Sequence, residues 1–324
     1  MPSFSKVLNT IARQWKLNRA ELLESAEEII KHLQNTDGSE TPQNGSDLIQ
    51  REVQIFEHTF DNTHGGFGHA PKFPTPHNLL FLMLYAKQNN NAGALNMAEK
   101  TLKQMRKGVI FEHVGYGFSR YSTDGYYLAP HFEKMLYDNS LLIMAYASLY
   151  SITKNNIYLY TAKKTAEYIL NEMTSEGGGF YLCESNSTEL FINPKETYDG
   201  AIPSGNSVMT YNLVRLHQIT EKKEYKKLME KQITIMSAKS YEYPSGNSMF
   251  LIAMLLHEDS IPHITVAIKE HADLNQIREK MPFIANVLVV TDSIEYPILN
   301  NQTTFYVCKN RNCLPPTRDI KSLR

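Results

Sequence analysis

The chain has 324 residues, 42% of them hydrophobic, and a formal net charge of -1. This apolar content is enough for a sizeable folded core and excludes a disordered chain, and the balanced charge argues against a general nucleic-acid-binding surface, which needs an excess of basic residues. The longest apolar runs, at residues 79–86 and 141–150, are shorter than the roughly 20 residues of a membrane-spanning helix, so we expect neither a nucleic-acid nor a membrane partner.

The N-terminal part predicts two helices, over residues 3–14 and 19–33, because apolar residues recur there at helical spacing. Its basic residues are scattered through this pattern, whereas a signal peptide has a charged start followed by an apolar block. Residues 35–46 are polar, with two glycines and a proline, and predict an exposed linker. Asp47 is the expected N-cap of a helix that runs to about residue 60.

A stretch rich in glycine and proline follows, and it excludes helix between Gly65 and Pro74. Thr75 and Pro76 then predict an N-cap with proline at the first helical position. The helix that they open extends to about residue 87, and a second helix at residues 92–107 pairs with it.

The same order of loop and helix recurs further along. Pro130 predicts a helix from about His131 to residue 152, followed by another at 157–173. The sequence PSGNS occurs at Pro203 and at Pro244, each time before an apolar helix, and a helix at 223–238 lies between the two copies. The glycine loops and the prolines after them recur every roughly 50–60 residues, which indicates repeated helical hairpins.

Such a repeat predicts a mainly α fold in which inner and outer helices alternate around a ring, with the glycine and proline loops at one end. The tail has a different pattern. Short β-branched runs at residues 263–267, 285–291 and 303–308, around a helical pattern at 274–280, predict a small α/β unit.

Four motifs carry a family resemblance. They are GGFGHAPKFPTP at residues 65–76, GFSRYSTDGYYLAPHFEKMLYDN at 117–139, DGAIPSGNS at 199–207 and FYVCKNRNCLPPT at 305–317. Together with the first fifteen residues, they resemble the YyaL family, also called the spermatogenesis-associated protein 20 family. The resemblance implies a thioredoxin-like domain with a Cys-x-x-Cys-type motif, an (α/α) toroid similar to six-hairpin glycosidases and N-acylglucosamine 2-epimerases, and a small C-terminal unit.

The chain departs from this family pattern. It contains no Cys-x-x-Cys, and segments expected from the middle of the toroid are missing between Tyr181 and Asp199. We therefore expect a shortened form without the thioredoxin-like domain: N-terminal helices and linker at residues 1–46, an incomplete (α/α) toroid of helical hairpins at 47–258, and an α/β unit at 259–324. The exposed inner faces of an open ring would favour self-association.

The candidate catalytic residues lie in the central motif, on both sides of Pro130. They are Arg120, Asp124, His131, Glu133 and Asp138. On a helix that starts at His131, that residue would share one face with Lys134 and Asp138, and a histidine, a cation and a carboxylate together can do acid/base chemistry on a sugar or polyol. The alternative is an ordinary helix ion pair between Lys134 and Asp138.

Two kinds of pairing would fit two reactions. Glycoside hydrolysis requires two carboxylates, which Asp124 with Glu133 or Asp138 would supply from different segments. An epimerase could use His131 with His77 or His113 for proton abstraction and return. Candidate substrate-binding residues from the surrounding loops are Lys72, Phe73, His77, Asn78, Tyr121, Asp199 and Asn206. A purely structural role, in loop anchoring or helix capping, stays open for each.

The sequence thus predicts a carbohydrate-processing-like toroid, a glycoside hydrolase or sugar epimerase in ancestry, with a small sugar-like ligand. The alternative is a catalytically inactive, truncated paralogue that binds a ligand or partner, or has no maintained function. We expect no cofactor and no metal, because the spacing of His64, His69 and His77 is not that of a metal site. The three cysteines favour idle thiols and a cytoplasmic location over a disulfide framework.

Overall fold

A computed structural model describes residues 2–36, 45–186, 190–258, 262–269, 286–291, 293–309 and 312–319. The chain divides into two compact units, Met1–Glu52 and Val53–Arg324. The first unit contains α1 (Phe4–Leu17), α2 (Arg19–Thr36) and the start of α3 (Gly45–Thr59), so the three predicted N-terminal helices are confirmed. α3 begins at Gly45, two residues before Asp47, so the prediction that Asp47 is its N-cap is wrong. Most of the predicted linker lies outside the described residues.

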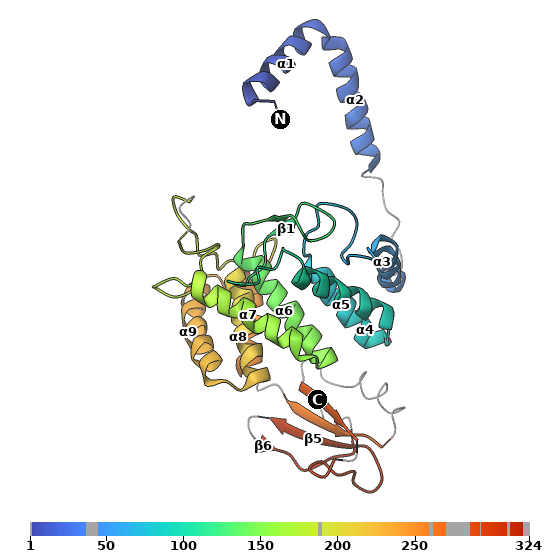
Figure 1. Ribbon diagram of the computed structural model, residues 1–324, viewed down its shortest axis with the longest axis vertical. Coiled ribbons are helices and arrows are strands. Elements are labelled where there is room, and N and C mark those ends of the chain that lie inside the picture. Colours follow the sequence, from blue (N-terminus) through green and yellow to red (C-terminus); the bar gives the residue numbers. More distant parts are fainter. Residues whose placement is uncertain are drawn as a thin grey trace. The chain divides into compact units, whose positions relative to one another are not determined.

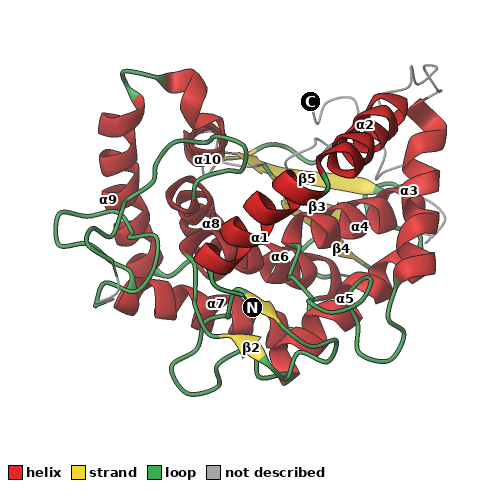
Figure 2. Ribbon diagram, turned by 90° about the horizontal axis from the view of Figure 1, so that it is seen from above, coloured by secondary structure: helices red, strands yellow, loops and turns green. Residues whose placement is uncertain are grey.

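The second unit is built from helical hairpins (Figure 1). Its helices are α4 (Pro76–Asn89), α5 (Ala92–Lys107), α6 (Leu136–Thr153), α7 (Asn156–Glu172), α8 (Gly205–Thr220), α9 (Lys223–Ser240) and α10 (Ser248–Glu258), the last preceded by the 3-10 helix η1 (Pro244–Asn247). Helices pack in the consecutive pairs α4/α5, α6/α7 and α8/α9, and α4, α6, α8 and α10 pack side by side. Figure 2 shows these four in one row, with α5, α7 and α9 outside it. The expected incomplete (α/α) toroid of inner and outer helices is confirmed.

The core follows from this arrangement. α6 lies between α4, α7 and α8, and nine of its residues are buried, among them Leu142, Ile143 and Tyr146. A helix that is apolar on several faces must be covered on several faces, because leaving those side chains in water costs free energy. The position of α6 at the centre of the helical row satisfies this requirement.

Three loops at the start of the inner helices are built alike. Each is closed by an isolated antiparallel bridge, Phe60–Phe67, Phe111–Phe118 or Thr174–Phe180. In each, the residue after the first bridge residue donates its N–H to a glycine carbonyl at 3.0 Å: Asp61 to Gly66, Glu112 to Gly117 and Ser175 to Gly179. All three glycines have φ between 75° and 81°, which L side chains rarely adopt. The predicted repeat is therefore confirmed at the level of single hydrogen bonds.

The start of α6 differs from the prediction. The helix begins at Leu136, and His131 belongs instead to a two-stranded antiparallel ribbon of β1 (Tyr121–Ser122) and β2 (Pro130–His131). The ribbon continues through a 2.8 Å hydrogen bond from Arg120 N to Glu133 O. The backbone of this stretch is satisfied by pairing between loops, so tertiary hydrogen bonds override the local helical pattern.

The C-terminal sheet has its own small core. Its strands are β3 (His263–Ala267), β4 (Asn286–Val290), β5 (Thr304–Lys309) and β6 (Asn312–Cys313), in the order β4-β3-β5-β6, with only the β3/β4 pair parallel. Ile264, Val266 and Phe305 are buried in this sheet's core. The three predicted strands are confirmed, and the predicted helix at 274–280 lies outside the described residues.

The cysteines correct one expectation. Cys308 and Cys313 lie opposite each other on β5 and β6 and form a disulfide, so the prediction of idle thiols is wrong for this pair. Their spacing alone does not reveal the pairing, because it depends on the strand hairpin that places them face to face. Cys183 is a buried thiol. Among the helices of the described residues, none has both the length and the apolar character to cross a membrane.

Candidate functional site

A cluster of charged side chains surrounds the first turn of α6. Asp138 lies in that turn, and its side chain is 16% exposed. Its Oδ2 is 3.1 Å from Nη1 of Arg120, which also hydrogen-bonds the hydroxyl of Tyr137. Burial raises the pKa of Asp138 to about 6, against the lowering effect of Arg120, and the charge of Glu133 raises it further. The cluster therefore holds a carboxyl that changes its protonation state near neutral pH.

This cluster can perform proton transfer. A carboxyl with a pKa near the working pH can both give and take a proton, which is the requirement for general acid/base catalysis. Glu133 is exposed and acts electrostatically on Asp138, so the two carboxylates lie near each other in contrasting environments. Of the predicted catalytic residues, the structure brings Arg120, Glu133 and Asp138 together.

Three aromatic side chains form a second feature, the aromatic stack of Phe73, Tyr121 and His131. Ring centroids are 4.7 Å apart for Phe73 and Tyr121, and 4.9 Å apart for Tyr121 and His131, with interplanar angles of 26° and 20°. The first and second loops are joined here by a backbone bridge between Lys72 and Ser122. Phe73 and His131 are exposed, so both ends of the aromatic stack are open to a ligand.

The aromatic stack and the Asp138 cluster do not coincide. They share no residue, although Arg120 of the cluster directly precedes Tyr121 of the stack in the chain. The prediction that His131, Lys134 and Asp138 share a helix face is wrong, because the first two precede the helix. The Lys134–Asp138 ion pair is wrong as well: Lys134 Nζ lies 3.3 Å from Glu112 and 3.1 Å from the carbonyl of Tyr116.

Several predicted pocket residues are bound within the protein. Lys72 is 2% exposed and donates to Asp61 at 2.6 Å and to the carbonyl of Gly65 at 2.8 Å. Asp124 accepts hydrogen bonds from the N–H groups of Tyr126 and Leu128 in its own turn. Burial opposes the ionisation of Asp124, but these bonds outweigh it and lower its pKa.

The later loops show the same use of polar groups. Asp199 accepts from Ser204 N at 2.8 Å and from Met249 N at 2.7 Å, so it joins the starts of α8 and α10. Asn206 is 1% exposed and binds both the N–H and the carbonyl of Phe180, at 2.8 and 2.9 Å. These contacts favour structural roles for Asp199 and Asn206.

The remaining candidates lie on the first turn of α4. His77 is exposed and Asn78 is half-buried, and their side chains make no hydrogen bond to the residues that the structure describes. In the described part of the chain, no group of three or more His, Cys, Asp or Glu side chains is arranged to hold a metal ion.

Asn139 was not among the predicted site residues, although the sequence left open that Asp138 and Asn139 hydrogen-bond a neighbouring loop. Asn139 is fully buried, accepts from Phe118 N at 2.7 Å and donates to Phe118 O at 2.9 Å and to Met135 O at 3.0 Å. Asn206 holds Phe180 in the same way. The signal was present in the sequence, since each of these loops is followed by an asparagine early in the next inner helix.

No family model matches the chain. Spermatogenesis-associated protein 20 of Mus musculus is 37% identical over 204 residues, which are 60% of this chain and 26% of that protein. Over these 204 residues the chain is homologous to spermatogenesis-associated protein 20. The resemblance predicted from the four motifs is thereby confirmed. An uncharacterized protein of Caenorhabditis elegans is 33% identical over 222 residues, 62% of this chain and 28% of its own. The chain therefore spans about a quarter of the length of the curated relatives that it matches.

Solved structures were also found to be similar. A cellobiose 2-epimerase from Bacillus thermoamylovorans has a TM-score of 0.48 at 16% identity, covering 58% of this chain and 54% of that chain. A family 76 α-mannanase from Bacteroides thetaiotaomicron has a TM-score of 0.49 at 15% identity, with 60% and 55% covered. An unsaturated glucuronyl hydrolase specific for heparin has a TM-score of 0.49 at 15% identity, with 58% and 54% covered.

The Asp138 carboxyl is expected to titrate with a midpoint near pH 6. Its folded pKa of about 6 lies above the usual value of 3.8, so its contribution to stability is fully present in acid, below the unfolded pKa, and is lost as the pH rises through 6. Carboxyl ¹³C NMR on aspartate-labelled protein measures the midpoint, with Asp138→Asn to assign the signal. Arg120→Gln should move the midpoint upward, because Arg120 stabilises the ionised form. A midpoint below 4 would contradict this assignment.

Proposed function

We propose that this chain processes a carbohydrate, as a glycoside hydrolase or a sugar epimerase, with Asp138 as the group that transfers the proton. One observation carries the proposal: Asp138 is a mostly buried carboxyl with a pKa of about 6, held by Arg120 beside the second carboxylate Glu133. It lies where a loop enters an inner helix, and several such entries lie in a row along the incomplete toroid.

The roles follow from the geometry. In its protonated form Asp138 donates to a leaving-group oxygen or to a carbon, and in its ionised form it takes a proton back. Arg120 fixes the carboxylate orientation and favours its return to the ionised state. Glu133, which is exposed, stabilises positive charge that develops on the sugar or activates a water molecule. The aromatic stack offers an apolar surface to a sugar ring.

A panel of sugars, disaccharides and uronic acids tests the proposal. A bound sugar should raise the melting temperature of the full chain, and a substrate should either be cleaved or take up deuterium at carbon from D₂O, as NMR detects. Asp138→Asn should keep the shift in melting temperature and lose turnover roughly 100-fold or more. His131→Ala should weaken the melting-temperature shift instead. If no member of the panel raises the melting temperature, the proposal fails.

A second candidate is a binding protein without catalysis. It is favoured by one observation, that Lys72, Asp199 and Asn206 are all engaged in bonds within the protein and leave fewer groups for chemistry. The same panel separates the two. A sugar that raises the melting temperature, with neither cleavage nor deuterium uptake in the wild type, would establish binding without turnover.

A further inference from the structure

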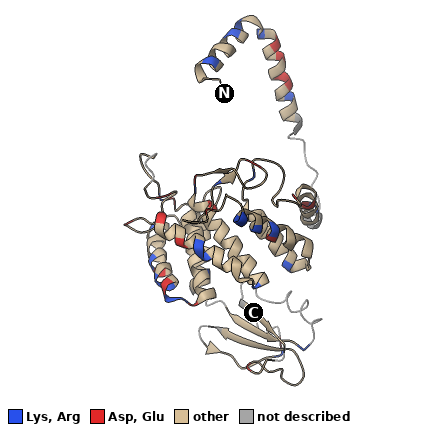
Figure 3. Ribbon diagram, in the orientation of Figure 1, with Lys and Arg blue, Asp and Glu red and all other residues tan. Residues whose placement is uncertain are grey.

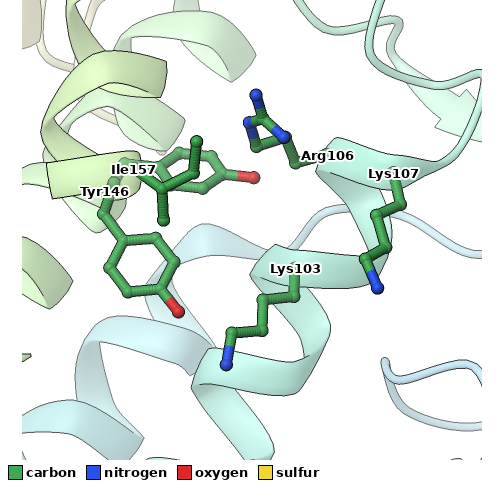
Figure 4. Close-up of a pocket in the computed structure, with 6 residues that line it drawn as sticks. Lys103, Arg106, Lys107, Tyr146 and Ile157 are labelled. Atoms are coloured by element: carbon green, nitrogen blue, oxygen red, sulfur yellow. The ribbon is translucent and has the colours of Figure 1, made fainter. Parts of the chain in front are cut away.

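A cavity of about 300 Å³ lies between the outer helices α5 and α7. It shares no lining residue with the Asp138 cluster or the aromatic stack. Its lining residues are Lys103, Arg106 and Lys107 from the C-terminal turns of α5, Tyr146 from α6, and Ile157 and Tyr158 from the start of α7. Figure 4 shows the basic side chains leaving α5 beside the ring of Tyr146 and the side chain of Ile157. The cavity thus has an apolar wall and a basic rim.

The two tyrosine hydroxyls of the apolar wall are both engaged within the protein. The hydroxyl of Tyr146 donates to the carbonyl of Leu102 at 2.7 Å, and that of Tyr158 hydrogen-bonds Glu99. Both tyrosines are almost fully buried. Their buried rings close the floor of the cavity, and the apolar surface beside them that a ligand can reach is that of Ile157, which is 37% exposed.

The basic rim keeps an excess of positive charge. Figure 3 shows several basic positions together along α5. Burial opposes the ionisation of Glu99, but hydrogen bonds from Lys103 and Tyr158 outweigh it and lower its pKa. Glu99 therefore stays charged and neutralises Lys103, whose Nζ is 2.8 Å away. Arg106 and Lys107 have no carboxylate partner among the described residues, so two cations remain for a ligand.

Arg106 is held in place for this task. Its Nε donates to Thr161 Oγ1 at 2.9 Å, and Thr161 is itself fully buried and donates to the carbonyl of Ile157 at 2.8 Å. The terminal nitrogens of the guanidinium make no hydrogen bond to any described residue. A guanidinium fixed through Nε keeps a planar pair of donors, which matches the oxygens of phosphate or carboxylate.

We propose that this cavity binds a small anion that carries a flat apolar ring. The ring packs against Ile157 above the two buried tyrosines, and the phosphate or carboxylate group binds Arg106 with help from Lys107. The volume is at the lower end for small-molecule sites, so it fits one ring and one anionic group.

Isothermal titration calorimetry on the full chain tests this with four probes: phenyl phosphate, benzoate, inorganic phosphate and the neutral phenyl β-glucoside. Phenyl phosphate or benzoate should bind with one molecule per chain and more tightly than inorganic phosphate, which lacks the ring, or phenyl β-glucoside, which lacks the charge. The affinity should fall as salt is added. Arg106→Gln should weaken binding about tenfold or more, and Lys107→Gln should weaken it less. Lys163→Gln removes the same charge from α7 outside the cavity lining and should change nothing.

The choice between the two aromatic anions identifies the group that the site prefers. Equal binding of phenyl β-glucoside would overturn the proposal, as would affinities unchanged in both Arg106→Gln and Lys107→Gln, or no binding of either anion. Lys107 is exposed, so Lys107→Gln keeps the test decisive if loss of the Thr161 contact destabilises Arg106→Gln. Asp138→Asn should leave phenyl phosphate binding intact, which separates this site from the proposed sugar site.

Discussion

Replacing Asn139 by alanine is expected to lower the free energy of unfolding by about 3 kcal/mol, because buried polar groups that lose their only partner cost about 1–3 kcal/mol each. The Asn139 amide binds both the N–H and the carbonyl of Phe118 in a fully buried setting. Alanine cannot replace either bond, and the Phe118 side chain in this loop is 0% exposed. Urea denaturation followed by circular dichroism measures the change.

Two matched variants sharpen this test. Asn206→Ala removes the equivalent clamp on Phe180 and should cost a similar amount. Asn89→Ala removes an asparagine whose single bond, to the carbonyl of Tyr85 at 3.1 Å, is exposed, so it should change stability by less than about 0.5 kcal/mol. A loss below about 1 kcal/mol for Asn139→Ala would show that the loop is not fixed through this amide.

The helices were predictable because their signals are local. Pro76 opens α4 as expected, although Thr75 before it has a left-handed backbone and makes no side-chain cap hydrogen bond, and the bounds of α5 match the apolar spacing. The start of α6 was not predictable, because Pro130 and His131 look like the first residues of a helix but pair with β1. That pairing depends on a strand from the same loop and on its bridge to the preceding loop, and local propensity carries no information about either.

The site was predictable in its region but not in its grouping. The central motif supplies Arg120, Glu133 and Asp138, which the structure brings together. His131 belongs to the aromatic stack instead. It lies in a strand and not in the predicted helix, and this changes which side chains share a face with it. Asp124 was proposed as a catalytic carboxylate because of its residue type alone. Its hydrogen bonds to its own turn depend on the backbone conformation of that turn, which the sequence does not reveal.

Replacing Asp61 by alanine is expected to lower the free energy of unfolding by about 3 kcal/mol, because breaking a buried ion pair leaves its partner charge uncompensated. The charge left unpaired is that of Lys72, which is 2% exposed and keeps contacts to the carbonyl of Gly65 at 2.8 Å and to the ring of Tyr127, whose centroid is 5.6 Å away. Asp61 also accepts hydrogen bonds from the N–H groups of Thr63 and His64. The substitution therefore removes the bonds that hold this turn as well as the ion pair.

The repeat provides the control. Glu112 occupies the equivalent place in the second loop, where it accepts from Val114 N and Gly115 N and pairs with Lys134 at 3.3 Å. Its side chain is 42% exposed, against 24% for Asp61, so Glu112→Ala should cost clearly less. The double variant Asp61→Ala, Lys72→Met should recover part of the loss, because it removes the unpaired charge. Equal losses for the two single variants would contradict the role of burial.

The same ion pair also links stability to pH and to the proposed sugar-binding surface. Burial opposes the ionisation of Asp61, but Lys72 and the backbone donors outweigh it and hold its pKa well below the usual value. Its stabilising contribution is therefore present above the unfolded pKa near 4 and is lost as the pH falls through the folded one, so the gap between wild type and Asp61→Ala should close in acid. Phe73 follows Lys72 in the chain and forms one end of the aromatic stack. Asp61→Ala should accordingly weaken sugar binding at pH 7, whereas Glu112→Ala, from the other loop, should not.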